Sequence, residues 1–374
     1  MKNIFLTTLL CGSLVISAAA QTVEAPLGFE EYDPLSTLKV EENIPTRAKF
    51  PFIDVHNHQY RMPDQDLDKL VAQMDSMNMG IMVNLSGRGW YQNWEEGTAH
   101  LKGGLANVMK SQPKRIAIFT NLQFKGFGEA DWTQKAVAQL ETDVKLGAKG
   151  LKIYKSLGFS GIVDEKGKRV AVNDPRLDPV WAKCGALGIP VLIHTADVPS
   201  FWDPLDRYNE RWLELKTHPG RKRSATDPVP FVDLIGEQHD IFRKHPGTTF
   251  INAHMGWYAN DLKKLDSLMT VFPNTYVEIG AVIAELGRQP RAAKKFFDKY
   301  QDRVLFGKDS WVPSEYVTYF RVLETEDEYF PYHKKYHAFW RMYGLGLSDE
   351  VLKKLYYKNA LRIIPGLDKS AFPD

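Results

Sequence analysis

From residue 52 onward, apolar residues follow two alternating patterns. Short, nearly continuous apolar and β-branched runs occupy residues 52–55, 81–85, 116–120, 150–154, 190–193, 249–253, 275–279 and 304–306. Helix-period stretches with a charged face occupy residues 67–79, 131–146, 179–187, 231–244, 259–271 and 291–300. Continuous apolar runs are typical of parallel strands that helices cover on both faces. The pattern therefore predicts eight parallel strands that alternate with helices.

Alternating units of this number predict an α/β fold, a (β/α)8 TIM barrel over residues 52–374 with inserted loops on its C-terminal face. The alternative is an open doubly wound sheet, but no Gly-x-Gly-x-x-Gly turn follows the first predicted strand. A final helix is predicted over residues 349–364, because Ser348 precedes it and Pro365 ends it.

Two long segments interrupt the alternation. Residues 162–172 follow the fourth predicted strand and have the pattern of a hairpin with a Lys-Gly turn. Residues 200–227 follow the fifth strand and carry Phe201, Trp202, Tyr208 and Trp212. Both segments follow the carboxyl end of a strand, which is the active-site face of a barrel. We expect the aromatic segment to form a lid or a pocket wall, although loops also tolerate insertions without function.

The first residues have the pattern of a secretory signal. Lys2 precedes a mostly apolar stretch at residues 4–16, and small residues allow cleavage after Ala20. The apolar stretch is short for a membrane anchor, and Leu10 before Cys11 does not suit a lipoprotein signal. We therefore expect residues 1–20 to be removed and residues 21–51 to form an N-terminal arm. The mature protein is expected to be periplasmic or secreted, and not bound to a membrane.

Composition and charge narrow the class of protein. Of the 374 residues, 44% are hydrophobic and 25% are charged, which is near the globular average and excludes a disordered chain. The formal net charge of +2 gives no reason to expect a nucleic-acid partner. Cys184 is the only cysteine beyond the predicted signal, so the mature chain can form no internal disulfide. The expected partner is a small molecule, and a homodimer is expected from base rates alone.

Groups that can bind a metal follow four of the predicted strands. His56 and His58 end the first strand and point to the same side of it. His194 ends the fifth strand, His254 ends the sixth, and Asp309 follows the eighth. One such histidine alone would be a hydrogen-bonded core residue, and Asp309 alone a helix cap. Together, imidazole and carboxylate groups at one barrel rim indicate a metal centre.

The motifs around these residues resemble the amidohydrolase superfamily, in the amidohydrolase-related branch that also contains decarboxylases and hydratases. The resemblance covers residues 52–367. It rests on Asp-Val-His-Asn-His at 54–58, Val-Leu-Ile-His-Thr at 191–195, Ala-His-Met-Gly at 253–256, Val-Leu-Phe-Gly-Lys-Asp-Ser at 304–310 and Asn-Ala-Leu-Arg-Ile-Ile-Pro-Gly at 359–366.

The resemblance implies a role for each residue at the rim. His56, His58, His194 and Asp309 would hold one divalent ion, with zinc preferred over other first-row metals. Asp309 would accept a proton from water and deliver it to the leaving group. His254 would polarise or protonate the substrate, or would bind a second metal ion.

The fourth predicted strand leaves several roles open. Lys152 and Tyr154 share one face and are expected inside the barrel, because Leu151 and Ile153 on the other face should contact helices. Some superfamily members carry a carbamylated lysine on this strand that bridges two metals, and Lys152 fits that position. It equally fits a cation that binds a substrate carboxylate, or a lysine that reaches a carboxylate such as Glu278.

Further candidates for substrate binding lie near the same rim. They are Arg61, Arg88, Glu278 and Trp257, together with Lys152 and Tyr154. An arginine in a pocket suits carboxylate or phosphate recognition through its planar fork. The two arginines also fit the surface, and Trp257 also fits simple packing.

These observations favour an exported metal-dependent hydrolase that attacks a C–N or C–O bond of a small organic substrate. A metal-dependent decarboxylase or hydratase of a small carboxylic acid is the alternative, because it would use the same ligands. A binding protein with a structural zinc ranks last, since ligands at the barrel face usually serve catalysis.

Overall fold

The computed structural model describes residues 27–28, 31–91, 93–224, 229–335 and 337–373. The chain divides into residues 1–37 and residues 38–374, and all helices and strands among the described residues belong to the second unit. The predicted signal at residues 1–20 lies outside the described residues. Described residues 31–51 contain neither helix nor strand.

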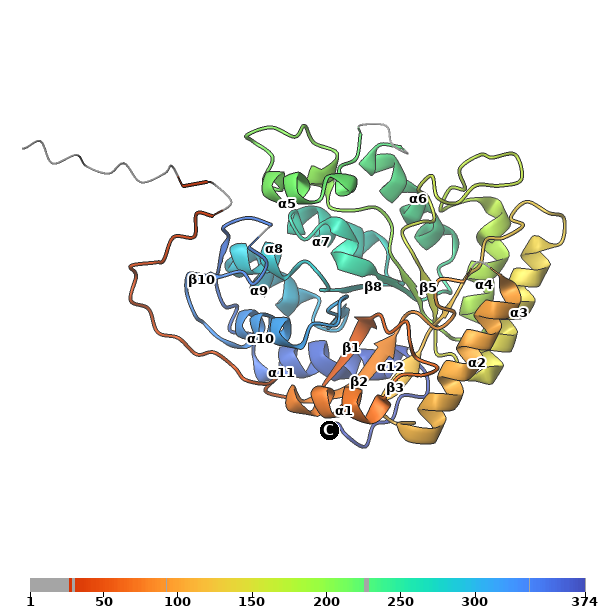
Figure 1. Ribbon diagram of the computed structural model, residues 1–374, viewed down its shortest axis with the longest axis horizontal. Helices are drawn as coiled ribbons and strands as arrows, with labels where there is room; N and C mark the ends of the chain where they lie inside the picture. The colour runs from red at the N-terminus through yellow and green to blue at the C-terminus, as the bar shows by residue number, and fades with distance from the viewer. Residues whose placement is uncertain (1–26, 29–30, 92, 225–228, 336, 374) are drawn as a thin grey trace, which may run out of the picture. The chain divides into compact units, whose positions relative to one another are not determined.

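Parallel strands form the centre of the second unit (Figure 1). One sheet contains β1 (Phe52–Asn57), β2 (Met79–Asn84) and β3 (Ile116–Ile118). The other contains β4 (Thr120–Asn121), β5 (Leu151–Ile153), β6 (Val191–Ile193), β7 (Phe250–Asn252), β8 (Thr275–Glu278) and β9 (Val304–Leu305). Only Phe119 separates β3 from β4, so these two are parts of one predicted strand. All eight predicted strands are therefore confirmed.

Hydrogen bonds also connect the first strand to the last. The backbone N–H of Val55 donates to the carbonyl of Phe306 at 3.0 Å, and that of Asp309 donates to the carbonyl of His56 at 2.6 Å. Asn57 and Asp309 form a parallel bridge at the same edge. The sheets therefore meet at both edges, which confirms the predicted barrel.

Helices follow the strands along the chain. They are α1 (Leu67–Ser76), α2 (Trp94–Ser111), α3 (Trp132–Leu146), α4 (Asp178–Ala186), α5 (Trp212–Thr217), α6 (Phe231–Lys244), α7 (Leu262–Val271), α8 (Ile283–Arg288), α9 (Pro290–Lys299), α10 (Tyr316–Glu324), α11 (Asp349–Lys353) and α12 (Asn359–Ile363). The predicted final helix is α11 and α12 joined by one π-helical turn, Lys354–Lys358. Its predicted start is confirmed, because the Ser348 hydroxyl accepts a hydrogen bond from the N–H of Val351.

The sequence pattern predicted no helix at α2, although it is the longest of the described helices. Its apolar face is interrupted by glycines that the packing requires. A Cβ on Gly97 would lie 2.6 Å from the Gln123 side chain, and one on Gly104 would lie 3.1 Å from Met62. The same glycines weaken the helical pattern, because glycine has a low helix propensity.

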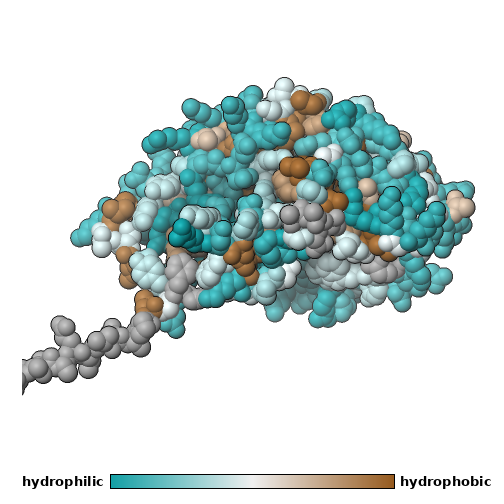
Figure 2. Space-filling view, turned by 90° about the horizontal axis from the view of Figure 1, so that it is seen from above, coloured by the Kyte–Doolittle hydropathy of each residue, from teal (hydrophilic) through white to brown (hydrophobic). Residues whose placement is uncertain are grey.

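Further parts of the fold are the hairpin after β5, a small separate sheet and a mainly hydrophilic face (Figure 2). The predicted hairpin is present in short form, because Val163 pairs antiparallel with Arg169 around Gly167, which has a φ of 73°. A separate two-stranded sheet joins β10 (Phe330–Pro331) and β11 (Arg341–Met342). The face in Figure 2 is mainly hydrophilic, with small separate hydrophobic areas. Within the described ranges, no helix has both the length and the apolar character that a membrane span needs.

Arg88 follows β2 and is fully buried in the fold. Its guanidinium donates to both carboxylate oxygens of Asp143 on α3, each at 3.0 Å. It also donates to Gln123 Oε1 at 2.7 Å and to the carbonyl of Trp94 at 2.8 Å. The arginine that the sequence suggested for substrate binding therefore uses its donors to connect β2 with α2 and α3.

We expect Arg88→Met to lower the free energy of unfolding by about 3–5 kcal/mol, because it leaves the Asp143 carboxylate buried without its cation. Urea denaturation followed by circular dichroism measures the change. Arg61→Met is the matched control, since the Arg61 side chain is 77% exposed and pairs only with exposed Asp64. An unfolding midpoint of Arg88→Met equal to that of the control would show that the buried pair does not stabilise the fold.

Candidate active site

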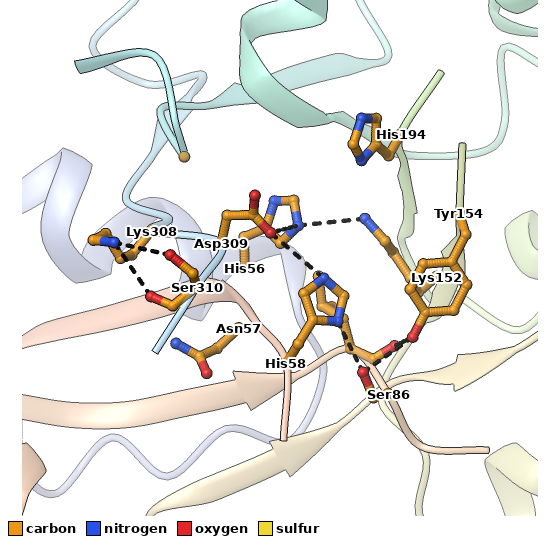
Figure 3. Close-up of polar contacts among 12 residues, drawn as sticks. His56, Asn57, His58, Ser86, Lys152, Tyr154, His194, Lys308, Asp309 and Ser310 are labelled. Atoms are coloured by element: carbon orange, nitrogen blue, oxygen red, sulfur yellow. Dashed lines mark hydrogen bonds and ion pairs between the residues drawn. The ribbon is translucent and has the colours of Figure 1, made fainter. Parts of the chain in front are cut away.

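His56 and His58 at the end of β1 face the carboxylate of Asp309 (Figure 3). Oδ1 of Asp309 lies 3.4 Å from Nε2 of His56 and 3.7 Å from Nε2 of His58. The pairing of β1 with the segment after β9 brings these residues together, although they are far apart in the sequence. The structure thus unites three of the predicted metal ligands around one point.

The backbone is strained where two of the predicted catalytic residues are attached. Asp309 has a φ of 81° and His254 a φ of 55°. Non-glycine residues adopt such angles at a cost of about 1–3 kcal/mol each, and only where the surrounding structure holds them. Such strain is concentrated at functional sites, which supports a functional role for this rim.

Hydrogen bonds on Nδ1 assign the tautomers of two histidines. Nδ1 of His56 lies 2.9 Å from Oε1 of Glu278, and Nδ1 of His254 lies 2.7 Å from the carbonyl of Gly280. A carbonyl only accepts, and so does an ionised carboxylate, so each Nδ1 carries the proton. In the neutral form of each ring the lone pair is then on Nε2, which is the nitrogen that can bind a metal.

A chain of hydroxyl groups orients His58 in the same way. Nδ1 of His58 lies 2.8 Å from the Ser86 hydroxyl, which lies 3.0 Å from the Tyr154 hydroxyl. Tyr154 in turn donates to the carbonyl of Leu85 at 3.2 Å. Because Tyr154 donates its only hydroxyl proton to this carbonyl, it accepts a hydrogen bond from Ser86. Ser86 in turn accepts from Nδ1 of His58, which therefore carries the proton. Sequence reasoning missed Ser86, whose signal is its position two residues after β2.

Glu278 lies fully buried behind the histidines. Its carboxylate accepts hydrogen bonds from the backbone N–H of His254 at 2.7 Å and of Gly280 at 2.6 Å, besides that from His56. Burial favours the neutral acid, but the charge and the hydrogen bond of His56 outweigh it and lower the pKa of Glu278 to about 2. Carboxylates that hold the far nitrogen of a ligand histidine are typical of zinc sites. Glu278 is therefore placed as a positioning residue rather than at a substrate surface.

His194 lies beside this group. Two sets of side chains bring their possible ligand atoms within 4.8 Å of one another. One set is His56, His58 and Asp309, and the other is His56, His254 and Glu278. Nδ1 of His194 lies 3.3 Å from Nε2 of His254, whereas its Nε2 is buried and has no hydrogen-bond partner among the described residues. Burial holds the pKa of His194 well below its usual value, so the ring is neutral. A neutral imidazole with an unsatisfied buried nitrogen fits a metal ligand.

Lys152 and Tyr154 point into the barrel, as strand alternation predicted (Figure 3). The Nζ atom of Lys152 lies 3.4 Å from Nε2 of His56, and the side chain is buried. Burial lowers the pKa of Lys152 to about 8, although Asp309 and Glu278 oppose the shift. A lysine with a lowered pKa beside imidazole nitrogens is suited to chemistry rather than to structure alone.

A first cavity, of about 200 Å³, reaches this group from one side. We call it the charged cavity. Its wall contains His194, His254, Trp257, Asp309, Lys155, Asp197, Arg211, Glu214, Arg221 and Lys334. The Trp257 ring stacks on the His254 ring, with centroids 4.5 Å apart. Three of the charged residues belong to residues 200–227, so the expectation of a pocket wall there is confirmed.

A second cavity, of about 220 Å³, lies on the side of Lys152 and Tyr154. We call it the aromatic cavity, because Trp90, Tyr91 and Phe124 line it together with Tyr154. Arg88, which the sequence suggested for substrate binding, is also among its lining residues. Arg61 is not among the lining residues of either cavity. It pairs at the surface with Asp64 at 2.7 Å. The structure therefore does not bring Arg61 to the metal-binding group.

Comparison with solved structures shows similar barrels. A putative amidohydrolase from Staphylococcus aureus has a TM-score of 0.54 and 16% identity, covering 84% of this chain and 99% of that one. A 2,6-dihydroxybenzoate decarboxylase has a TM-score of 0.53 and 14% identity, covering 84% and 98%. A 4-oxalomesaconate hydratase from Rhodopseudomonas palustris has a TM-score of 0.51 and 12% identity, covering 84% and 95%. No curated protein matches the chain.

At these identities the similarity establishes the fold alone. The family itself is shown by a family model described as Amidohydrolase, which matches residues 53–366. That match contains the barrel strands from the second residue of β1 onward and every residue of the group around Asp309. The protein therefore belongs to this amidohydrolase family, whose members are metal-dependent enzymes.

Proposed function

We propose that the protein is a metal-dependent hydrolase that cleaves a C–N or C–O bond of a small organic molecule. One observation carries the proposal. The carboxylate of Asp309 faces the Nε2 atoms of His56 and His58 and also forms part of the wall of the charged cavity. A base at that place is within reach of both a metal site and a substrate.

The donor set suits zinc, because neutral imidazoles and one carboxylate are its usual ligands in enzymes. His56, His58 and Asp309 would hold the ion, and the unsatisfied nitrogen of neighbouring His194 would complete the set. A bound divalent ion lowers the pKa of water from about 15.7 toward about 7 and so supplies hydroxide at neutral pH.

The protein's own groups handle the protons. Burial would raise the pKa of Asp309, but His56 and His254 lower it well below its usual range, so the carboxylate is ionised. Asp309 accepts a proton from the attacking water and delivers it to the leaving group. His254 carries its proton on Nδ1, so its Nε2 accepts hydrogen bonds and cannot protonate a substrate without first taking up a proton. The ammonium of Lys152 is the nearby group that stabilises negative charge on the substrate.

A decarboxylase or hydratase is the second candidate, because four cationic side chains line the charged cavity. Its wall carries Lys155, Arg211, Arg221 and Lys334 against Asp197, Glu214 and Asp309. Such a wall suits the carboxylate of a small acid. Two proteins with similar barrels are a decarboxylase and a hydratase.

We expect the purified protein to contain about one zinc ion per chain, as a single set of four ligands implies. Glu278→Gln should lower zinc affinity about 10- to 100-fold, because it weakens the partner that orients His56. Competition with a chromophoric chelator measures the affinity. Glu237→Gln on α6 is the control, because Glu237 pairs with Arg169 instead. Unchanged affinity of Glu278→Gln would contradict the assignment, and two zinc ions per chain would indicate a carbamylated Lys152.

Isotope labelling separates the two reactions. With N-acyl amino acids, lactones and aryl esters as a panel in H₂¹⁸O, a hydrolase places ¹⁸O in the carboxyl group of the product. Asp309→Asn should lower turnover by about 10²- to 10⁴-fold or more, since it removes the base, whereas Asp302→Asn at an exposed site should not. Turnover of carboxylic acids that releases CO₂ would establish the lyase instead.

We also propose that the protein is exported and that its mature form begins at Gln21. Mass spectrometry of the protein recovered from the periplasm or the medium should show a chain without residues 1–20. An intact Met1 on cytoplasmic protein would exclude export by this signal.

A further inference from the structure

Residues of β5 and of the segment that follows it line both cavities. Lys152, Ile153, Tyr154 and Ser156 line the aromatic cavity, whereas Lys155 lines the charged cavity together with His194 and Asp309. Nζ of Lys152 lies 3.4 Å from Nε2 of His56, which itself lies 3.4 Å from Asp309. The charged cavity therefore borders the metal-binding group directly, whereas the aromatic cavity is connected to it through the side chain of Lys152.

The aromatic cavity offers an open ring surface next to His58. The Trp90 side chain stacks on Tyr154 with centroids 5.2 Å apart and on Tyr60 with centroids 4.7 Å apart. Tyr154 stacks in turn on His58, at 5.6 Å. Trp90 is nevertheless 63% exposed. A large apolar ring that stays exposed at the edge of a cavity is unusual unless it contacts a ligand.

The two side-chain amides of this cavity, on Asn121 and Gln123, already have hydrogen-bond partners. The side-chain oxygen of Asn121 accepts a hydrogen bond from the Arg88 backbone, and that of Gln123 accepts from the Arg88 guanidinium. The amide nitrogen of Gln123 donates to the carbonyl of Tyr91. A sugar ring needs polar partners of its own, so the occupied amides and exposed indole favour a planar aromatic ring.

The charged cavity favours an anion. Asp197 accepts hydrogen bonds from both Lys155 and Arg223, so two cations share one carboxylate. The single charge of Asp197 can balance only one of these two cations. The Lys155 side chain is 43% exposed and is within the cavity lining, where it can reach a ligand carboxylate.

Size supports the joint use of the two cavities. At about 200 and 220 Å³, each is smaller than the roughly 300 Å³ at which sites for small organic molecules begin, whereas the two together exceed it. A molecule with a single small ring would occupy only one of them.

We infer that the substrate is a two-part molecule in which an amide or ester joins an aromatic acyl group to a part that bears a carboxylate. The inference rests on the proposed hydrolysis and specifies its substrate class. The acyl ring lies on Trp90, the carboxylate lies at Lys155, and the bond between them lies at Asp309. The oxygen of water bonds to the acyl carbon. The C–N or C–O bond then breaks, and its electron pair goes to the leaving nitrogen or oxygen. The leaving nitrogen or oxygen then takes up the proton that water released.

Three probes test the inference by isothermal titration calorimetry on the zinc-loaded mature protein. N-benzoylglycine has both parts, N-acetylglycine lacks the ring, and benzamide lacks the carboxylate. We expect N-benzoylglycine to bind about tenfold or more tightly than either partial probe, since each part contributes. Trp90→Ala should weaken N-benzoylglycine and benzamide about two- to tenfold and leave N-acetylglycine unchanged.

Lys155→Met should weaken N-benzoylglycine and N-acetylglycine about tenfold, leave benzamide unchanged, and be rescued by Lys155→Arg. Matched controls are Tyr208→Ala, at an exposed ring outside both cavities, and Lys299→Met, at a lysine paired with Asp266. Neither control should change any of the three affinities.

Several results would overturn the inference. One is that none of the three probes binds. A second is that benzamide binds as tightly as N-benzoylglycine. A third is that Trp90→Ala and Lys155→Met each reduce the affinity of all three probes equally. If N-cyclohexanecarbonylglycine bound as tightly as N-benzoylglycine, the inference that the acyl ring is planar and aromatic would be overturned. Zinc content and product formation are measured on the same samples. If the probes showed the expected binding pattern but no product formed, the proposed hydrolysis would be wrong and the inference of a two-part ligand would still hold.

Discussion

The seam between β1 and the segment after β9 is the constraint on which the site depends. Asp54 lies buried in this seam and accepts hydrogen bonds from the backbone N–H of His56 at 3.0 Å and of Lys308 at 3.1 Å. It also accepts the hydroxyl proton of Tyr316 at 2.6 Å. One carboxylate thus holds the residues next to Asp309 and the backbone of His56 in register. The contacts that close the barrel between β1 and the segment after β9 are therefore also the contacts that bring His56 beside Asp309.

The second layer of contacts then determines what this group can do. A histidine binds metal only through a nitrogen that carries no proton, so a wrong tautomer would disable the site even with the rings in place. Glu278, the Gly280 carbonyl and the Ser86 hydroxyl prevent this for His56, His254 and His58 respectively. The same assignments restrict His254 to accepting at Nε2. In the proposed reaction, proton delivery therefore falls to Asp309, and stabilisation of negative charge falls to Lys152.

The sequence predicted those features that depend on one strand at a time. Apolar runs mark every barrel strand, and the polar residue that ends a run marks His56, His254 and Asp309, because strand ends meet at one rim. Features that depend on distant partners left no such mark. The burial of Arg88 depends on its ion pair with Asp143, which lies on α3. The orientation of the His254 ring depends on the backbone carbonyl of Gly280. These contacts exist only after the barrel has closed, so no local pattern records them.

The division of labour between strands and inserted segments explains how one family can serve several substrates. The residues that face the metal site are attached to strand ends, where closure of the barrel leaves little freedom. The surfaces farther out come from loops such as residues 200–227, which can change without disturbing the seam. The stretch from Lys152 to Lys155 belongs to both, because Lys152 within β5 faces the histidines while Lys155 after it lines the charged cavity. One short stretch of chain therefore carries both the lysine beside the metal-binding group and the lysine that we propose binds the substrate carboxylate.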